Sequence, residues 1–154
     1  MSARSSPKSF LGFDYGGKFI GVAVGSTQSG QAQALATVRV SASKEPDWTH
    51  IGRLVEQWRP DALVVGLPLN MDGSEQTMTR AARAFGDRLK ERYNLPVIMV
   101  DERLTTRVAK DILYAEGVAG TRQKGRLDEV AAQTILQSFL NSQDKSPNDD
   151  APGR

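Results

Sequence analysis

The stretch FLGFDYGGKFIGVAVG, residues 10–25, decides the fold because it predicts two strands joined by a tight turn. Residues 10–15 and 19–25 are mostly apolar, and the two glycines between them permit the positive φ angles that tight turns use. We therefore expect an antiparallel hairpin. Asp14 stands out in this run: either its carboxylate binds the amides of the glycine turn, or it has a chemical role.

Three more strands are expected after the hairpin. Small and β-branched residues at 34–40 predict the first of them. The runs DALVVGLP (61–68) and PVIMVDE (96–102) are apolar almost throughout, which is typical of parallel strands that are covered on both faces.

Helical patterns separate these strands and follow them. Residues 47–59 carry apolar side chains at helical spacing, which places both tryptophans, Trp48 and Trp58, in the expected core. A long polar helix is expected to start near Glu75. Two further helices are expected at 106–116 and 127–140.

This order of elements predicts an α/β domain with a mixed five-stranded sheet. Three antiparallel strands come first, β-α-β crossovers follow, and helices cover both faces. The first strand is expected at the centre, beside the strand that starts near Ala62. We assign residues 9–141 to this domain. Flexible ends are expected at 1–8 and 142–154, where the polar chain has too little apolar surface to order itself.

Composition narrows the chemistry. A chain of 154 residues, 39% hydrophobic and 25% charged, fits one globular domain. It has no cysteine and one histidine, His50, which excludes disulfides, thiolate nucleophiles and cysteine- or histidine-rich metal sites. Any metal must therefore have oxygen ligands. No apolar run approaches the roughly 20 residues of a membrane span and no signal peptide is evident, so we expect a cytoplasmic protein without a membrane partner.

Acidic residues fall where several expected elements meet. Ligands of such sheets bind at the carboxyl ends of strands, where Asp14 ends the first strand and Asp101 and Glu102 end the last. Side-chain alternation directs one of the last two acids to the same face as Asp14 and leaves open which one. Asp128 starts the apolar stripe of the final helix, so its carboxylate can reach the strand ends.

Converging carboxylates repel one another, and a divalent cation removes that repulsion. Mg²⁺ and Mn²⁺ prefer hard oxygen ligands. Either ion can activate a water molecule for attack on phosphorus and stabilise the leaving oxygen. The sequence thus predicts phosphodiester hydrolysis at this edge of the sheet.

Basic residues near this edge indicate a nucleic-acid partner, although the formal net charge is only +2. Cations in the glycine-containing segment before Asp128 can bind phosphates without displacing a metal. Thr105 is either a helix N-cap or a phosphate contact, and Ser74 is expected to cap the helix near Glu75. The residues expected to contact nucleic acid are Lys18, Asn70, Arg103, Thr105, Arg107, Arg122, Lys124 and Arg126.

Four motifs carry a family resemblance: GFDYGGKFIGVAVG (12–25), VVGLPLNMDGSE (64–75), DERLTT (101–106) and RLDEVAAQTILQSFL (126–140). Together they resemble the YqgF (RuvX-like) family of ribonuclease H-like proteins. The resemblance implies a ribonuclease H-like fold and a metal-dependent nuclease that matures the 5′ end of precursor 16S ribosomal RNA, with association with ribosome precursors. It implies Asp14, Glu102 and Asp128 as the acidic positions.

Several alternatives stay open at this level. Related nucleases often hold an acid on the fourth strand, where this chain reads VVGLPLN, so Glu102 has to substitute for it or Asp101 does. Some members of the family are described as Holliday-junction resolvases, which act on branched DNA. A non-catalytic RNA-binding module for ribosome assembly is a further alternative, and the glycine hairpin also resembles the phosphate turn of sugar kinases. The sequence does not separate RNA from DNA, fix the cleavage position or endo- versus exonucleolytic action, or define the oligomeric state.

Overall fold

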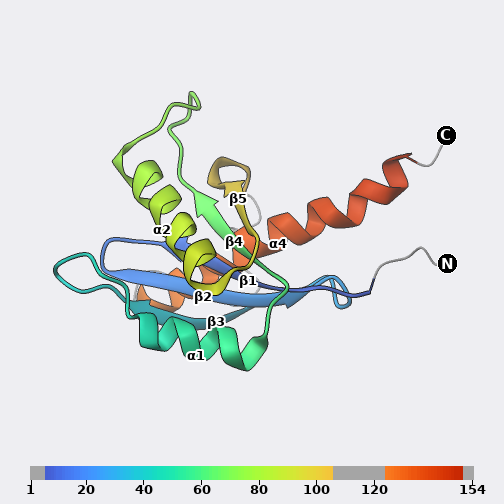
Figure 1. Cartoon of the computed structure of the whole chain (residues 1–154). Coiled ribbons are helices and arrows are strands. Elements are labelled where there is room, and N and C mark those ends of the chain that lie inside the picture. Colours follow the sequence, from blue (N-terminus) through green and yellow to red (C-terminus); the bar gives the residue numbers. More distant parts are fainter. Residues whose placement is uncertain (1–5, 106–123, 151–154) are drawn as a thin grey trace.

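The computed structural model of the chain describes the backbone of residues 6–105 and 124–150. Within these ranges the elements follow the expected order (Figure 1). The strands are β1 (Ser9–Tyr15), β2 (Phe19–Ser26), β3 (Ala32–Arg39), β4 (Ala62–Leu67) and β5 (Val97–Asp101). The helices are α1 (Trp48–Trp58), α2 (Thr77–Tyr93), the short 3₁₀ turn η1 (Glu102–Thr105) and α4 (Lys124–Asp150).

The mixed five-stranded sheet is confirmed, with the order β3-β2-β1-β4-β5. β1 pairs antiparallel with β2 and parallel with β4, so it lies at the centre as expected. β3 adds antiparallel to β2, and β5 adds parallel to β4. All six residues of β4 are buried, which explains the continuous apolar run of this strand.

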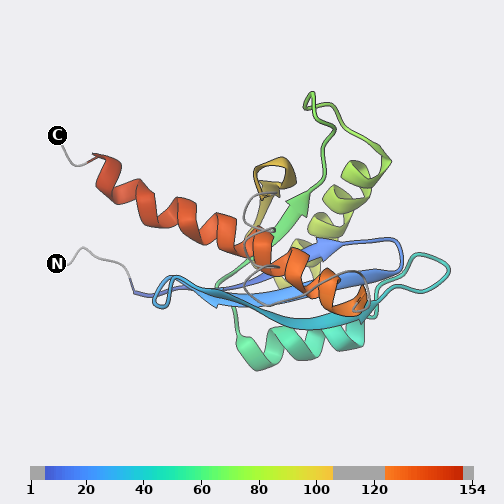
Figure 2. The ribbon, with the colours of Figure 1, turned by 180° about the vertical axis from the view of Figure 1, so that it is seen from behind.

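The sheet lies between two helical layers (Figures 1 and 2). On one face, Leu11 and Phe13 of β1 pack with α1 and α2 in the larger core. On the other face, Phe10 packs with α4, and its ring meets that of Phe139 edge-on at 5.0 Å. Consecutive residues of β1 therefore serve opposite cores, and the even-numbered positions, Asp14 among them, face α4.

The turn between β1 and β2 forms for a different reason from the expected one. Neither Gly16 nor Gly17 has a positive φ; among the described residues, only Gly30 and Gly73 are glycines of that kind. Close approach explains Gly16 instead, because a Cβ there would lie 2.6 Å from the carbonyl oxygen of Phe19. The hairpin prediction is confirmed, and its stated backbone reason is wrong.

The two tryptophans of α1 differ from each other. Trp48 is half-buried and stacks on Phe85 at 5.9 Å, with the guanidinium group of Arg92 at 4.2 Å from its ring. Trp58 is 38% exposed, so its predicted place in the core is wrong. It is the last residue of α1, where the helix ends at a left-handed Arg59.

Helix limits also differ from the sequence pattern. α2 begins at Thr77 with Gln76 as its N-cap, so the predicted Ser74 cap is wrong. α4 is longer than the expected 127–140 at both ends and includes residues for which a flexible tail was expected. The helix expected at 106–116 lies outside the described residues. None of the helices in the described part of the chain has the length and apolar character needed to cross a membrane.

Candidate active site

Asp14 lies near the carboxyl end of the central strand and faces α4. Its partner across the hairpin is Gly21 of β2, which has no side chain on that face. Two residues earlier on the same face, Gly12 approaches α4 so closely that a Cβ would lie 2.9 Å from Cβ of Leu136. Because these glycines have no side chains, the sheet surface around Asp14 is clear and α4 packs directly on it.

Glu102 reaches the same face from the neighbouring strands. It follows the last residue of β5, where Ile98 and Val100 already pack toward α4. Its side chain lies over Gly66 of β4, because a Cβ at position 66 would be 2.6 Å from Oε2 of Glu102. Gly66 therefore provides the space in which this carboxylate sits.

Asp101 is bound by a different partner. Its carboxylate accepts hydrogen bonds from the guanidinium group of Arg103, with Nη2 at 2.7 Å and Nε at 3.1 Å, and from the backbone N–H of Arg103 at 2.9 Å. These contacts hold the pKa of Asp101 below its ordinary value. Of the two acids at the end of β5, Glu102 is thus the one that joins Asp14.

The first part of α4 places Asp128 against the sheet. The backbone of this residue lies against Gly21, where an added Cβ would overlap the carbonyl oxygen of Asp128 and lie 3.1 Å from the backbone nitrogen of Glu129. Thr37 of β3 donates a hydrogen bond to Glu129 Oε2 at 3.0 Å. The carboxylate of Glu129 therefore connects α4 to β3 of the sheet, next to Asp128.

Asp14 and Glu102 form a tightly coupled acidic pair. The pKa of Asp14 is raised to about 8, first by loss of hydration, then by the charge of Glu102 and a hydrogen bond with it, and by the charge of Asp128. Loss of hydration also raises the pKa of Glu102. Burial and mutual repulsion thus both disfavour two full negative charges on this pair.

The donor set fits a hard divalent cation, because two partly buried carboxylates share one space above Gly66 and Gly21 and the charge of a third acts on Asp14. Across the described residues, however, no three acidic or histidine side chains are already grouped closely enough to hold a metal ion. Asp14 and Glu102 are brought together, and Asp128 lies near them without completing such a group.

The residues expected to contact nucleic acid have separate positions. Lys18 is exposed in the β1–β2 turn. Asn70 donates from Nδ2 to Oγ of Ser74 at 3.0 Å within the loop after β4, and Arg103 binds Asp101. Arg107 and Arg122 lie outside the described residues, as do the side chains of Thr105, Lys124 and Arg126.

Sequence reasoning did not single out Lys44, which lies at the β1–β2 turn and lines a hollow on the α2 face of the sheet, opposite the acidic pair. This residue has a positive φ of 68°, and its Nζ atom lies 3.4 Å from the carbonyl oxygen of Gly17, beside the turn that follows Asp14. With Tyr15 and Arg88 it lines a hollow of about 220 Å³. Arg88 is paired with Glu45 at 2.5 Å, so Lys44 supplies the positive charge of this hollow. Its position in an irregular loop has no periodic signal in the sequence.

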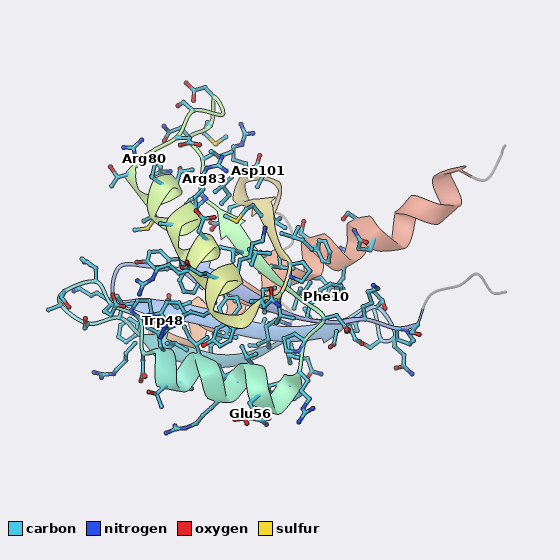
Figure 3. All side chains as sticks on the ribbon, in the orientation of Figure 1. Phe10, Trp48, Glu56, Arg80, Arg83 and Asp101 are labelled. Atoms are coloured by element: carbon cyan, nitrogen blue, oxygen red, sulfur yellow. The ribbon has the colours of Figure 1, made fainter. Side chains whose placement is uncertain are left out.

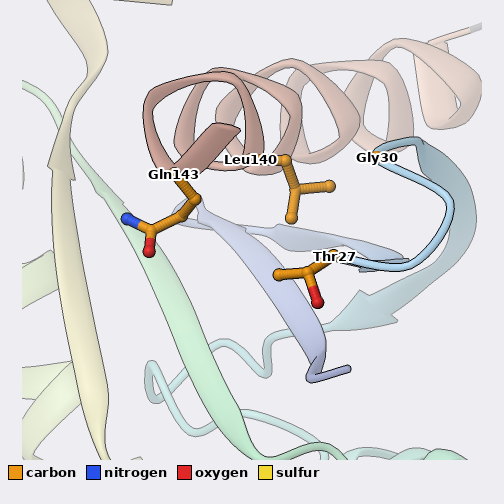
Figure 4. A pocket seen from close by; sticks show the side chains of 4 residues that line it. All are labelled: Thr27, Gly30, Leu140 and Gln143. Carbon is orange, nitrogen blue, oxygen red and sulfur yellow. The ribbon is translucent and has the colours of Figure 1, made fainter. Parts of the chain in front are cut away.

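Another small hollow, of about 70 Å³, lies at the opposite end of the hairpin (Figure 4). Thr27 and Gly30 of the β2–β3 turn and Leu140 and Gln143 of α4 line it. Ser26, at that end of β2, pairs with Ser9 at the start of β1, far along the strand from Asp14. This hollow contains no acidic residue and does not belong to the candidate site.

In Figure 3, Asp101 lies at the edge of the sheet close to the projecting loop between β4 and α2. Arg80 and Arg83 of α2 lie on the same side. Arg83 is paired with Glu75 of the loop at 2.9 Å. The loop between β4 and α2 is thus connected to α2 by an ion pair.

The sequence is similar to known nucleases over most of its length. A family model described as RuvX, Holliday junction resolvase, matches residues 8–142. A protein of Nitrosococcus oceani is 50% identical over 139 residues, which cover 90% of each chain. One from Coxiella burnetii (strain Dugway 5J108-111) is 50% identical over 133 residues, 86% of this chain and 92% of its own. Both relatives are assigned by name as pre-16S rRNA nucleases.

Solved structures with the same fold are more distant in sequence. RuvC from T. thermophilus in complex with a Holliday junction substrate has a TM-score of 0.55 at 18% identity and covers 90% of this chain and 97% of its own. The fowlpox virus Holliday junction resolvase has a TM-score of 0.50 at 15% identity, with 88% of this chain and 99% of its own covered. This likeness concerns the fold alone and confirms the ribonuclease H-like architecture.

Proposed function

The chain belongs to the RuvX family, described as Holliday junction resolvases, and on that premise we propose that its nuclease activity depends on Mg²⁺ or Mn²⁺ held by Asp14, Glu102 and Asp128. The observation that carries this proposal is the coupled pair of Asp14 and Glu102, in which the pKa of Asp14 is raised to about 8. Two carboxylates in one poorly hydrated space repel each other, and a bound divalent cation removes that repulsion.

The residues of the chain have separate tasks in this reaction. A bound metal ion supplies a Lewis acid and lowers the pKa of a coordinated water. Asp14 would offer its carboxylate to such an ion from the centre of the sheet. Glu102 offers a second carboxylate over Gly66, and Arg103, by holding Asp101, fixes the backbone on both sides of Glu102. Asp128 approaches from α4 and adds negative charge.

The proposed substrate is precursor 16S ribosomal RNA, because the similar proteins of Nitrosococcus oceani and Coxiella burnetii are assigned by name to that RNA. This substrate implies action in the cytoplasm and contact with ribosome precursors. We expect the phosphates to meet Lys18 in the β1–β2 turn, and Arg122, Lys124 and Arg126 ahead of Asp128. Branched DNA is the second candidate, favoured by the family's description.

Cleavage assays with purified protein distinguish between these two candidate substrates. A precursor 16S leader RNA and a four-way DNA junction are each incubated with the protein in Mg²⁺, in Mn²⁺ and in EDTA. We expect metal-dependent cleavage of the RNA at a discrete position. Cleavage of the junction alone would reverse the order of the two substrates, and equal cleavage in EDTA would refute the metal dependence.

A further inference from the structure

The loop between β4 and α2, residues 68–76, projects beyond the edge of the sheet that carries the acidic pair (Figure 1). Its tip presents Met71, which is 89% exposed. Among the described residues, Trp58 is the other large apolar side chain with such exposure, at 38%. A single exposed apolar residue is unremarkable on a surface, so the neighbours of Met71 decide whether it has a role.

The loop is held in one conformation by its own hydrogen bonds. The backbone N–H of Asn70 donates to the carbonyl of Ser74 at 2.9 Å, and that of Gly73, with a φ of +90°, donates to the carbonyl of Asn70 at 2.8 Å. Asp72 accepts from both the N–H and the hydroxyl of Ser74, at 2.9 and 2.6 Å. Met71 is therefore presented on an ordered tip, which lowers the entropy cost of using it for binding.

The same loop is fixed relative to the acidic pair. Nη1 of Arg103 donates to the carbonyl oxygen of Met71 at 3.1 Å, while the rest of its guanidinium group binds Asp101. Glu102 is the residue between Asp101 and Arg103. A hydrogen bond thus connects the Met71 tip to the backbone segment that carries Glu102.

The charge of the tip argues against a phosphate as its partner. Hydrogen bonds from Ser74 lower the pKa of Asp72, so the residue next to Met71 is a carboxylate at neutral pH. A carboxylate at the tip repels the phosphate backbone, whereas an apolar thioether gains from contact with the face of a base. Apolar side chains, methionine among them, insert between base steps in proteins that distort nucleic acids.

We propose that the 68–76 loop is a wedge that recognises structured nucleic acid, with Met71 stacking against a base that has been taken out of its helix beside the cleaved phosphate. Arg103 is a positioning residue of this wedge and does not itself bind phosphate. The inference rests on the proposed nuclease function and adds to it a preference for branched or imperfectly paired strands over unstructured ones.

The test compares Met71→Ser with Met71→Leu, which keeps an apolar tip, and with Trp58→Ser, which removes the other exposed apolar residue far from the acidic pair. Two RNAs share the same cleaved sequence, one with unpaired nucleotides in a stem and one unstructured. We expect Met71→Ser to lower the ratio of structured to unstructured cleavage on the order of 10-fold, the range expected for one stacking interaction. Met71→Leu and Trp58→Ser should retain the wild-type ratio.

A fluorescence measurement of binding tests the wedge independently of cleavage. A 2-aminopurine placed at the unpaired position should brighten when wild-type protein binds in Ca²⁺, and it should stay dim with Met71→Ser. An unchanged ratio and an unchanged fluorescence would overturn the wedge, and would point to a protein partner for the exposed tip. An equal loss on both RNAs would overturn the preference for structure. If wild-type protein cleaves neither RNA in Mg²⁺ or Mn²⁺, the proposed nuclease function itself fails, separately from the wedge.

Discussion

The backbone carbonyl of Asp128 lies against the α-carbon of Gly21, the residue that pairs with Asp14 across the β1–β2 hairpin. A contact between main chains of two elements leaves no room for a side chain at position 21. The distance between the final helix and the acidic pair is therefore set by a glycine in the second strand.

We expect Gly21→Ala to destabilise the protein by about 3 kcal/mol, in the upper part of the range for overpacked sites. The added methyl group meets backbone atoms of Asp128 and Glu129, which cannot rotate away. Thermal or urea unfolding measures the loss. Gly52→Ala in α1 is the matched control, because its Cβ would have open space and only Oη of Tyr93 at 3.6 Å. A Gly21→Ala protein as stable as the wild type would disprove this packing.

Gly66→Ala should reduce activity and also lower stability. The new methyl group would overlap Cδ1 of the buried Ile135 and lie 2.6 Å from Oε2 of Glu102, so the loss of stability should be about 1 to 3 kcal/mol, as at other overpacked sites. Displacement of Glu102 from Asp14 should lower cleavage at least 10-fold, since a misplacement of about 1 Å at a reacting centre has effects of that order or more. Single-turnover cleavage and the unfolding midpoint, measured on the same preparation, give the comparison. Loss of stability without loss of activity would contradict the position of Glu102.

The metal-free protein should lose stability as the pH rises. The pKa of Asp14 is about 8 in the folded protein against an ordinary value of 3.8, so the folded state binds this proton more tightly than the unfolded state. Between those two pH values stability therefore decreases with increasing pH. Asp14→Asn should remove this contribution to the slope. Unfolding midpoints in EDTA from pH 5 to pH 8 measure it, and parallel curves for the two proteins would refute the raised pKa.

The basic residues ahead of Asp128 should determine how binding depends on salt. Replacing Arg122 and Lys124 by alanine should lower the slope of log K against log salt by about 0.7 to 0.9 for each phosphate that the protein no longer neutralises. Arg53→Ala, on the exposed side of α1, serves as the control for a general loss of positive charge. Binding titrations at several salt concentrations distinguish the two. A slope equal to that of the wild type would show that these two residues are only surface charge.

The sequence predicted the sheet and the direction of Asp14 because alternation along β1 is regular, with Phe10 and Asp14 on one face and Leu11 and Phe13 on the other. It left the choice between Asp101 and Glu102 open because both stand where the strand ends and alternation breaks down. The ion pair with Arg103 settles that geometry, and it depends on a side-chain conformation that spacing does not encode.

Other features had no signal that a pattern could reveal. Gly21 and Gly66 leave space for the acidic residues because they have no side chains. In a sequence, such a glycine cannot be distinguished from one in a turn or a weak strand. Trp58 fits helical spacing, yet the helix ends there and the core does not continue. Ser74 has the properties of an N-cap, but its hydroxyl binds Asp72 inside the loop and α2 starts two residues later than that cap would require.

In the proposed reaction, Asp14 holds the metal ion that cleavage requires. Asp14→Asn keeps the shape of the side chain and removes its charge, and Asp87→Asn, an exposed acid on α2, changes the net charge equally. The direct measurement is Mn²⁺ binding by calorimetry together with cleavage of the leader RNA by all three proteins. We expect Asp87→Asn to match the wild type, and Asp14→Asn to bind Mn²⁺ at least 10-fold more weakly and to lose turnover by orders of magnitude. An Asp14→Asn protein that binds Mn²⁺ and cleaves as the wild type does would contradict the account.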